Sequence, residues 1–440
     1  MKKFITTLKN IFSIEDLRVR ILNTLLFLAI FRIGSYVVLP GVDADKLEAN
    51  NSGIFGLLDT FLGGAFSNAS VFGLGIMPYI TASIIVQLLT VAVPYFQKLQ
   101  KEGDSGRKKL TQMTRVLTIL VTLGQSIGYV TATIPAEAID PYFGRSLFVA
   151  SSMITLTAGT MFCMWLGEKI TEKGIGNGIS MLIMIGIISR LPGALIKEAA
   201  TRNMDGALVF ILELVVLFFV VMAVVMLTQA TRRIPVQYAK QVVGNKVYGG
   251  QRQFIPLKVN SAGVMPIVFA QSLMFIPAIV ATAFGGENET LGYIGATFGD
   301  PSSWQYSITF TILIIVFTFF YTAISVNPNQ IAEDMKRNNG FIPGVKPGEQ
   351  TSDYIANVID RITLPGALFL AAVAILPALA TQFGISRDFA QFFGGTSLLI
   401  MVGVVLDTLQ QIEGYLLMKH YEGLMQSGQF SESDQNVAVA

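Results

Sequence analysis

Ionisable side chains inside apolar stretches are the first candidates for chemistry in this sequence, because such charges usually serve ion or proton pathways. Three stand out: Arg32, Glu213 and Asp407. They are widely separated and form no cluster, which disfavours a proton relay or a site for a coupling ion. The leading interpretation for Arg32 and Glu213 is structural, with Arg32 pairing helices or extending its charge to the membrane interface.

Other kinds of site chemistry lack the residues they need. Cys163 and His420 are the single cysteine and histidine of the sequence, whereas disulfide frameworks and Cys/His metal clusters need several. The Gly-x-x-x-x-Gly-Lys-Ser/Thr phosphate loop is also missing. The sequence therefore predicts no metal site, no cofactor and no enzyme, and any driving force has to come from a partner.

The composition indicates a membrane protein. Of 440 residues, 52% are hydrophobic and 14% are charged, against about 25% charged residues in soluble domains. No cleavable signal peptide is expected, because the first apolar run contains Arg32 and ends at Leu39-Pro40-Gly41 without a small-x-small pattern.

A helix needs about 20 mostly apolar residues to cross a bilayer. Two weaker candidates begin at Ile179, with an interruption at Arg190-Leu-Pro192, and at Thr396, with Asp407 and Glu413 towards the end. Eight stronger candidates are 21–39, 73–93, 116–133, 147–166, 207–228, 262–284, 306–326 and 364–380. Ten spans are therefore expected, and both termini lie on the same side.

The basic residues select that side. Of the 31 Lys and Arg residues, 24 lie in the termini and one set of alternate loops, 6 lie in the opposite loops and Arg32 lies in a span. Lys and Arg remain preferentially on the cytoplasmic side. Both termini are therefore predicted to be cytoplasmic.

Residues 53–66 form an apolar segment that is too short to cross. Segments of this length are re-entrant or lie at the interface, and the residues alone leave both interpretations open.

A short internal similarity indicates that the two halves of the chain are related. Gly75-Ile-Met-Pro78 and Gly263-Val-Met-Pro266 each begin the second span of a five-span half. An odd number of spans per half means that related halves are inverted relative to each other.

Two long cytoplasmic loops, 229–261 and 327–363, carry basic residues and Gly/Pro-containing tips. Long ordered loops are usually functional, so docking of a partner is one interpretation. The alternatives are that the charges only set topology or that they contact RNA phosphates.

Eight distinctive strings run from the first span to the last: Phe31-Arg-Ile-Gly34, Gly75-Ile-Met-Pro-Tyr-Ile-Thr-Ala-Ser-Ile-Ile85, Lys101-Glu-Gly-Asp-Ser-Gly-Arg107, Met164-Trp-Leu-Gly-Glu168, Gly174-Ile-Gly-Asn-Gly-Ile-Ser180, Leu257-Lys-Val-Asn260, Pro347-Gly-Glu-Gln-Thr351 and Phe393-Gly-Gly-Thr-Ser-Leu-Leu399. Together, and in this order, they resemble the SecY family of protein translocase channels.

The resemblance implies an all-α membrane protein with ten transmembrane helices. Two inverted five-helix halves would form a clamshell around an hourglass pore with a short re-entrant plug helix. The expected parts are a cytoplasmic N-terminus, a first half with spans 1–5, a second half with spans 6–10, and a cytoplasmic tail, at 1–20, 21–200, 201–418 and 419–440. The expected function is passage of unfolded polypeptides across the bacterial plasma (inner) membrane, with sideways release of hydrophobic segments into lipid.

In the family a ring of aliphatic side chains closes the waist of the pore. Valine at 268, where isoleucine is common, is expected to widen the ring slightly. Two i,i+4 isoleucine pairs each share a helix face, although such pairs occur in any membrane helix. The positions that match the ring are Ile76, Ile80, Ile179, Ile183, Val268 and Ile400.

The resemblance also implies a plug and a lateral gate. Segment 53–66 matches the plug, and spans two, three, seven and eight would form the gate. Polar members of that gate, which could equally be ordinary packing contacts, are Gln87, Gln125 and Ser272. The apolar plug residues are Ile54, Phe55, Leu57, Leu58, Phe61 and Leu62.

The docking loops would contact the SecA motor or the ribosome, with SecE and SecG completing a heterotrimer. The family often has arginine before Pro-Gly-Glu-Gln, whereas this chain has Lys346, so motor coupling can differ in detail because the two side chains are not interchangeable. The expected contact residues are Lys246, Arg252, Lys336, Arg337 and Lys346.

Two other function classes remain as alternatives. A secondary transporter of a small solute predicts charged or ligating residues at the membrane midplane and saturable uptake by this chain alone. A non-conducting membrane scaffold predicts no crosslinks between cargo and the interior. The scarcity of charges within the spans disfavours the transporter, and the full-length series of strings disfavours both.

Overall fold

The computed structural model describes residues 12, 14–43, 46–47, 59, 62–140, 144–202, 206–238, 241–243, 246–248, 252–271, 273–274, 297–298 and 303–426. Helices dominate these residues, and the elements keep the order expected from the apolar runs.

The helices up to residue 202 form the first group. Proline occupies the first turn of α4 and of α5, where its missing N–H costs no helical hydrogen bond. The break between these two helices, at Val93, bends the chain by 98°. The elements of this group are α2 (Glu15–Gly34), α4 (Met77–Ala92), α5 (Pro94–Lys101), α6 (Asp104–Thr133), η2 (Ala136–Ala138), α7 (Arg145–Lys173) and α8 (Gly178–Arg202).

The second group follows the chain from residue 207. Residues 265–271 are helical between the strands and α12. The other helices are α9 (Ala207–Gln229), α12 (Trp304–Ser325), α13 (Pro328–Arg337), α14 (Glu349–Gln382), α15 (Arg387–Ala390) and α16 (Gly395–Gln426).

Among the described residues, seven helices are long and apolar enough to cross a membrane, or up to eight if the bent pair α4 and α5 is one span. The expected first span corresponds to α2, whose 20 residues include Glu15, Asp16, Arg18, Arg20 and Arg32. The expected span 262–284 lies largely outside the described residues. The remaining expected spans each contain or overlap one of the apolar helices.

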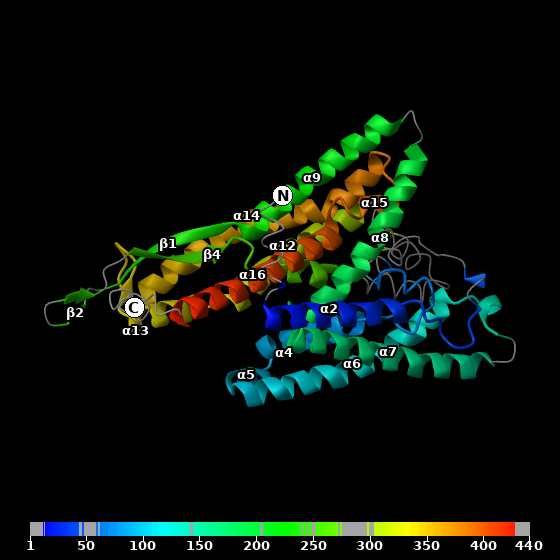
Figure 1. Ribbon diagram of the computed structural model, residues 1–440, viewed down its shortest axis with the longest axis horizontal. Coiled ribbons are helices and arrows are strands. Elements are labelled where there is room, and N and C mark those ends of the chain that lie inside the picture. Colours follow the sequence, from blue (N-terminus) through cyan, green and yellow to red (C-terminus); the bar gives the residue numbers. More distant parts are fainter. Residues whose placement is uncertain are drawn as a thin grey trace.

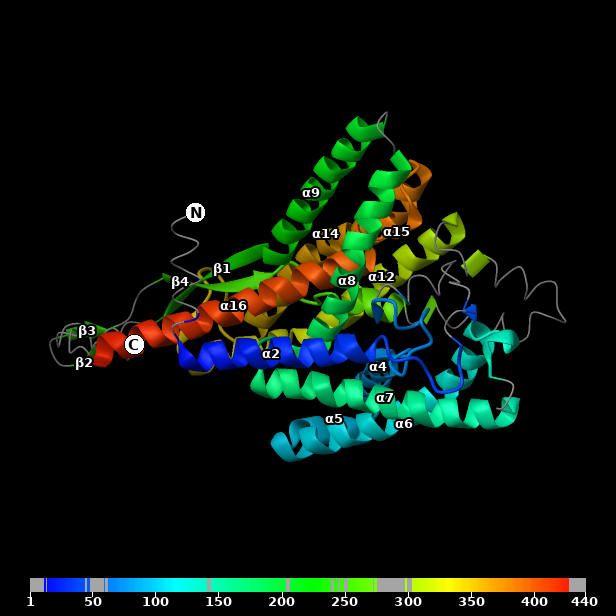
Figure 2. The same ribbon diagram turned by 45° about the vertical axis from the view of Figure 1, so that its right-hand side comes forward.

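The two groups of helices lie on opposite sides of α8. In Figures 1 and 2, α2 and α4 to α7 gather on one side and α9, α12, α14 and α16 on the other. Helix α8 contacts α2 and α7 from the first group and α9, α15 and α16 from the second. A movement of one group relative to the other therefore has to involve the surface of α8.

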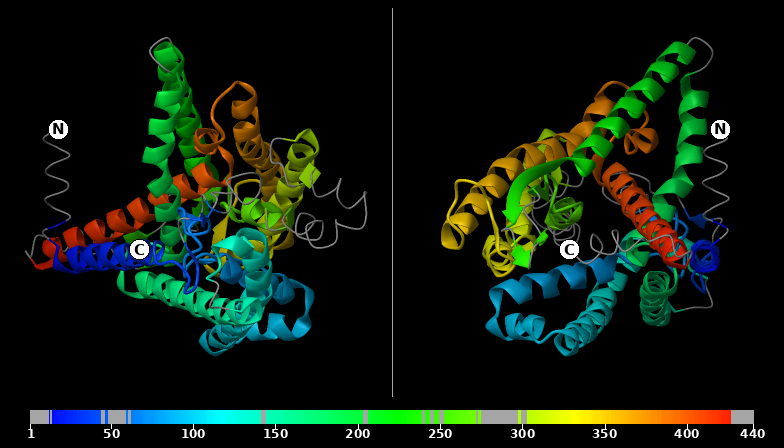
Figure 3. Two further views of the ribbon diagram at one scale, coloured as in Figure 1. Left: turned by 90° about the vertical axis from the view of Figure 1, so that its right-hand side faces the viewer. Right: turned by 60° about the vertical axis from the view of Figure 1, so that its left-hand side comes forward.

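The described residues of the expected loop 229–261 include four strands, so the expectation of an all-α chain is wrong in this part. Strand β1 (Thr231–Tyr238) pairs antiparallel with β4 (Arg252–Lys258) and with β5 (Gly340–Phe341), while β2 (Gln241–Val243) pairs with β3 (Lys246–Tyr248). Ile234 and Val236 are buried on alternate positions of β1, the period-2 pattern of a half-buried strand. Figure 3 shows β1 continuing from the end of α9.

The basic loops meet at one end of the molecule. The strands, α5 and α13 lie towards the left of Figure 1, whereas α15 and the junction of α8 and α9 lie towards the right. Three of the segments that are rich in Lys and Arg, namely those that contain the strands, α5 and α13, therefore lie towards the same end.

Helix α6 buries a row of hydroxyl side chains at four-residue spacing, Thr114, Thr118, Thr122 and Ser126. Each hydroxyl donates to a carbonyl one turn earlier in α6 itself, over 2.6 to 2.9 Å. Helix α6 lies between α4 and α7. The row therefore allows close packing without leaving a buried hydroxyl donor unpaired.

Candidate functional site

The six predicted ring residues belong to one apolar cluster. Ile76 and Ile400 are buried within it, and Ile80, Ile179, Ile183 and Val268 pack against it partly buried. They come from the start and first turn of α4, from α8, from helix 265–271 and from α16. Aliphatic side chains from α4, α8, helix 265–271 and α16 therefore pack in one apolar cluster.

The predicted plug is described at Leu62, whereas Ile54, Phe55, Leu57, Leu58 and Phe61 lie outside the described residues. Leu62 is 4% exposed and packs in a second apolar cluster with Phe66, Tyr129 and Phe148. It also lies against Gly75, which has a positive φ of 50° and where a Cβ atom would come within 2.3 Å of the Leu62 Cδ2 atom. Gly75 directly precedes Ile76, one of the predicted ring residues, so Leu62 lies against the residue next to that position.

Three polar contacts join Asp59 and residues 62–67 to the surrounding helices. The buried carboxylate of Asp59 forms an ion pair with Arg190 of α8 and accepts hydrogen bonds from the amide and the hydroxyl of Ser67 at 3.0 and 2.5 Å. Arg32 of α2 donates to the carbonyl of Gly63 at 3.0 Å. This contact gives Arg32 a structural role, in line with the interpretation from the sequence.

The third contact comes from α6, where the Tyr129 hydroxyl donates to the Phe66 carbonyl at 2.7 Å. The pairing of Asp59 with Arg190 was not predicted from the sequence. The sequence shows only that Asp59 is an acidic residue in an apolar segment and that Arg190 is a basic residue in an apolar span. Neither pattern indicates which residue the charge contacts.

Glu213 also has a structural partner. Arg202 at the end of α8 donates to Glu198 at 3.0 Å, to Glu213 of α9 at 2.7 Å and to the Gly384 carbonyl at 2.7 Å. The second oxygen of Glu198 accepts from the amide of Ser386 at 3.0 Å. The network joins α8, α9 and the turn before α15, so Glu213 stabilises helix contacts.

Asp407 is exposed on α16. The three intramembrane charges therefore contact different parts of the structure and do not converge. Within the described part of the chain, no group of three or more His, Cys, Asp or Glu side chains could hold a metal ion. The arrangement offers no evident chemistry for a coupling ion.

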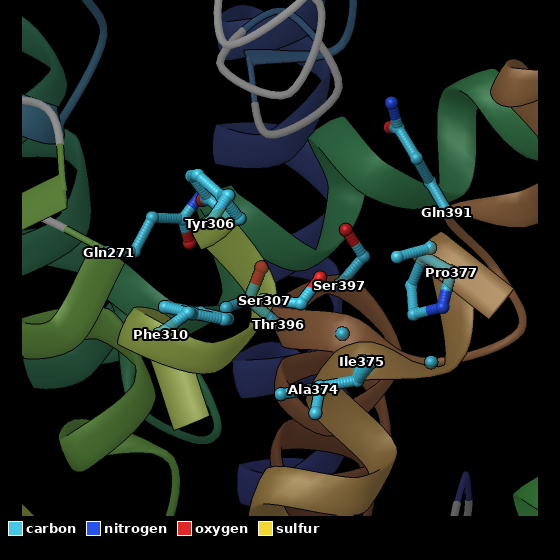
Figure 4. A pocket seen from close by; sticks show the side chains of 13 residues that line it. Gln271, Tyr306, Ser307, Phe310, Ala374, Ile375, Pro377, Gln391, Thr396 and Ser397 are labelled. Carbon is cyan, nitrogen blue, oxygen red and sulfur yellow. The ribbon is translucent and has the colours of Figure 1, made fainter. Parts of the chain in front are cut away.

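The predicted gate residues lie on neighbouring helices, with Gln87 on α4 and Gln125 on α6, both half-buried. Ser272 lies outside the described residues. Its neighbour Gln271 is buried and lines a pocket with Tyr306 of α12 and Ser397 of α16. Figure 4 shows Gln271 and Gln391 on opposite sides of this pocket. Gln271 was not predicted as a pocket residue, because a single amide side chain in an apolar run does not indicate which helices surround it.

The predicted docking residues are spread over the sheet end. Lys246 begins β3 and Arg252 begins β4. Lys336 and Arg337 end α13, where Arg337 and Glu333, both largely exposed, are 3.7 Å apart. Lys346 is exposed in the turn before α14. Pairing of β1 with β4 and β5 joins the two expected docking loops into one structure.

Comparisons with known proteins give the family. The family model described as SecY matches residues 70–409. A protein translocase subunit SecY of Streptomyces galbus is 43% identical and covers 96% of this chain and 100% of its own. One from Halalkalibacterium halodurans is 44% identical over 95% of this chain and 99% of its own.

Solved structures share the fold. One described as a protein conducting channel has a TM-score of 0.63 at 17% identity and covers 90% of this chain and 91% of that chain. The Sec61 of a canine ribosome–channel complex from the endoplasmic reticulum has a TM-score of 0.61, again at 17% identity, over 90% of this chain and 91% of that chain. With a family model that covers most of its length and relatives above 40% identity, the chain belongs to the SecY family.

Proposed function

We propose that the chain is the protein-conducting channel of a translocase, which passes unfolded polypeptides across the membrane and releases hydrophobic segments sideways into lipid. It is a channel subunit and not an enzyme. The observation that carries this function is the meeting of six aliphatic residues from both halves in one apolar cluster. A narrow apolar constriction gates by dewetting and offers a passing chain no polar group to bind.

In this proposal the ring consists of Ile76, Ile80, Ile179, Ile183, Val268 and Ile400. Residues 53–66 act as the plug, which the contacts of Leu62 with Gly75 next to the ring support. The lateral gate includes α4 and α6, with Gln87 and Gln125 on its surface. Ten spans in two inverted halves form the clamshell, and α8 of the first half contacts α9, α15 and α16 of the second.

The partners follow from the family and the surface. SecE and SecG complete the heterotrimer, and SecA or the ribosome docks on the end that carries the strands, α13 and Lys346. The protein lies in the bacterial inner membrane with both termini in the cytoplasm. The gathering of the basic loops at one end supports this orientation.

Crosslinking tests the function directly. A photoreactive residue at position 80 should crosslink to a stalled secretory chain. The matched control is position 85, because Ile85 lies on the same helix, is 37% exposed and is not a member of the cluster. Labelling at 85 without labelling at 80, or saturable uptake of a small solute by the purified chain, would contradict the proposal.

A further inference from the structure

The carboxylate of Asp59 is enclosed as part of a built contact. The residue is 0% exposed, and its two oxygens accept from the Ser67 amide and hydroxyl while Arg190 supplies the positive charge. A buried carboxylate is costly unless it is paired and hydrogen-bonded. Removing Arg190 from this position would leave Asp59 without the cation that compensates its burial.

Arg190 shares a face of α8 with the ring. Residues 179, 183, 186 and 190 fall on one side of a helix with 3.6 residues per turn. Ile183 and Arg190 are seven residues apart, about 10 Å along the axis. A rigid movement of α8 that separates Ile179 and Ile183 from the ring therefore also withdraws Arg190 from Asp59.

Gly63 shows how closely the segment is seated on this face. It has a positive φ of 62°, and a Cβ atom there would lie 2.9 Å from the Gly186 Cα atom and 2.5 Å from the Arg32 Nη1 atom. No side chain fits between the segment and α8 at this point. The backbone at Gly63 is thus held between α8 and the guanidinium of Arg32, which donates to its carbonyl.

The costs of separation fall unequally on the two charged groups. The Arg190 side chain is 26% exposed, and it lines a pocket with Lys197 and Asp388 of α15. Arg190 therefore keeps access to water and to a second carboxylate in that pocket, whereas the Asp59 side chain is 1% exposed. The penalty for breaking the pair is carried mainly by Asp59.

We propose that Asp59 and Arg190 form a latch that couples Asp59 and residues 62–67 to the α8 face that carries Ile179 and Ile183, and that this latch sets how strong a signal sequence must be to open the channel. The inference rests on the proposed channel function. It deepens that function by assigning two specificity-determining residues to the closed state. Weakening contacts made only in one state shifts the population towards the other.

The test compares export of one reporter with an intact and with a defective signal sequence. Asp59→Asn should raise export of the defective reporter relative to the intact one, on the order of tenfold, the usual size of coupling between two sites. Arg190→Gln should act in the same direction, and Arg190→Lys should restore much of the discrimination because it keeps the charge. The double variant should exceed neither single variant substantially, since both changes break the same contact.

Lys197→Gln is the matched control. Lys197 lies on the same helix and pocket but pairs with Asp388 at 2.9 Å and is 66% exposed. Its replacement should leave the ratio of the two reporters unchanged. The amount of each variant in the membrane and its melting temperature show whether it has folded, and Asp59→Asn, which keeps the side-chain shape, covers the case in which Arg190→Gln does not fold.

Two results would overturn the latch: an unchanged export ratio in folded Asp59→Asn, or additive effects in the double variant. The proposed function fails differently. If the unaltered protein does not export the intact reporter and position 80 gives no crosslink, the channel assignment is wrong. If export and the crosslink are normal but the ratio is insensitive to Asp59, only the latch is wrong.

Discussion

Helix α8 carries two arginines that each hold buried carboxylates, and the two sites are built differently. Arg190 pairs with one carboxylate, Asp59, from a short segment. Arg202 pairs with two, Glu198 and Glu213, and also binds the carbonyl of Gly384. Both sites place a guanidinium beside acids that are at most 6% exposed.

The difference lies in what each arginine connects. The Arg202 network joins α8, α9 and the turn before α15, and the Ser386 amide closes it on Glu198. Separating any of these elements would break several charged contacts at once. The Arg190 contact joins α8 to a single segment, so one movement releases it. The same chemistry therefore produces a fixed contact at one end of the helix and a releasable contact about three turns away from it.

The largest expected effect comes from Arg202→Met. This change leaves two buried carboxylates without their cation, and removing one partner of a buried pair costs about 3–5 kcal/mol. We expect a clear fall in melting temperature in detergent and low levels in the membrane. Arg190→Gln, measured alongside, should lower the melting temperature less. Equal losses in the two variants would remove the distinction between fixed and releasable contact.

Replacing Ile183 tests whether the Arg190 end of α8 borders the seal. Ile183→Gly removes a ring side chain, so the constriction should widen and wet, and the resting ion conductance in planar bilayers should rise. Ile188→Gly is the control, because Ile188 is 37% exposed on the same helix and pays the same penalty of about 1 kcal/mol for glycine. Unchanged conductance with Ile183→Gly would count against this face as part of the seal.

Glu213→Gln sharpens the description of the fixed contact. Arg202 would keep Glu198 and the Gly384 carbonyl, and a neutral amide can still accept its hydrogen bond. The expected loss of stability is therefore about 1 kcal/mol, the size of one hydrogen bond. Glu198→Gln should cost more, because Glu198 holds both Arg202 and the Ser386 amide. A reversed order in thermal unfolding would place the centre of the network on α9.

The smallest effect on stability is expected outside both sites. Lys346 is exposed, so Lys346→Glu should change the free energy of unfolding by no more than about 0.5 kcal/mol. It should nevertheless impair motor-driven export more than insertion of ribosome-bound chains, because it places a repulsive charge at a docking surface. Arg145→Glu, an exposed reversal at the opposite end, should leave both activities intact. Equal loss of both activities with Lys346→Glu would indicate misfolding or a shared contact.

The apolar runs predicted where helices cross but not where they end. The run 364–380 lies inside α14, which begins at Glu349 and includes Asp353, Asp360 and Arg361. Those polar residues are compatible with a helix in water, so hydropathy marks only the portion within the membrane. The strands were harder to predict, because Ile234 and Val236 give only a short period-2 pattern and Pro235 between them argues against a central strand.

The candidate site was less accessible to sequence reasoning. The local sequence does not show which helices the isoleucines at 76, 80, 179 and 183 contact. The ring was predicted from the resemblance to the SecY family. Asp59 and Arg190 are 131 residues apart in the sequence. Their pairing depends on how a broken segment folds back onto α8, which no local pattern encodes.

The hydroxyl row on α6 has a consequence for how the helices can separate. Each hydroxyl of this row donates its hydrogen bond to a carbonyl of α6 itself, as described for Thr114, Thr118, Thr122 and Ser126. Separation of α6 from a neighbouring helix therefore breaks none of these hydrogen bonds and leaves none of these hydroxyl donors unpaired in lipid. What is lost is close van der Waals contact, which falls off gradually with distance and is regained against lipid chains. The energy needed to separate α6 from a neighbouring helix therefore rises gradually, with no single bond that has to break first.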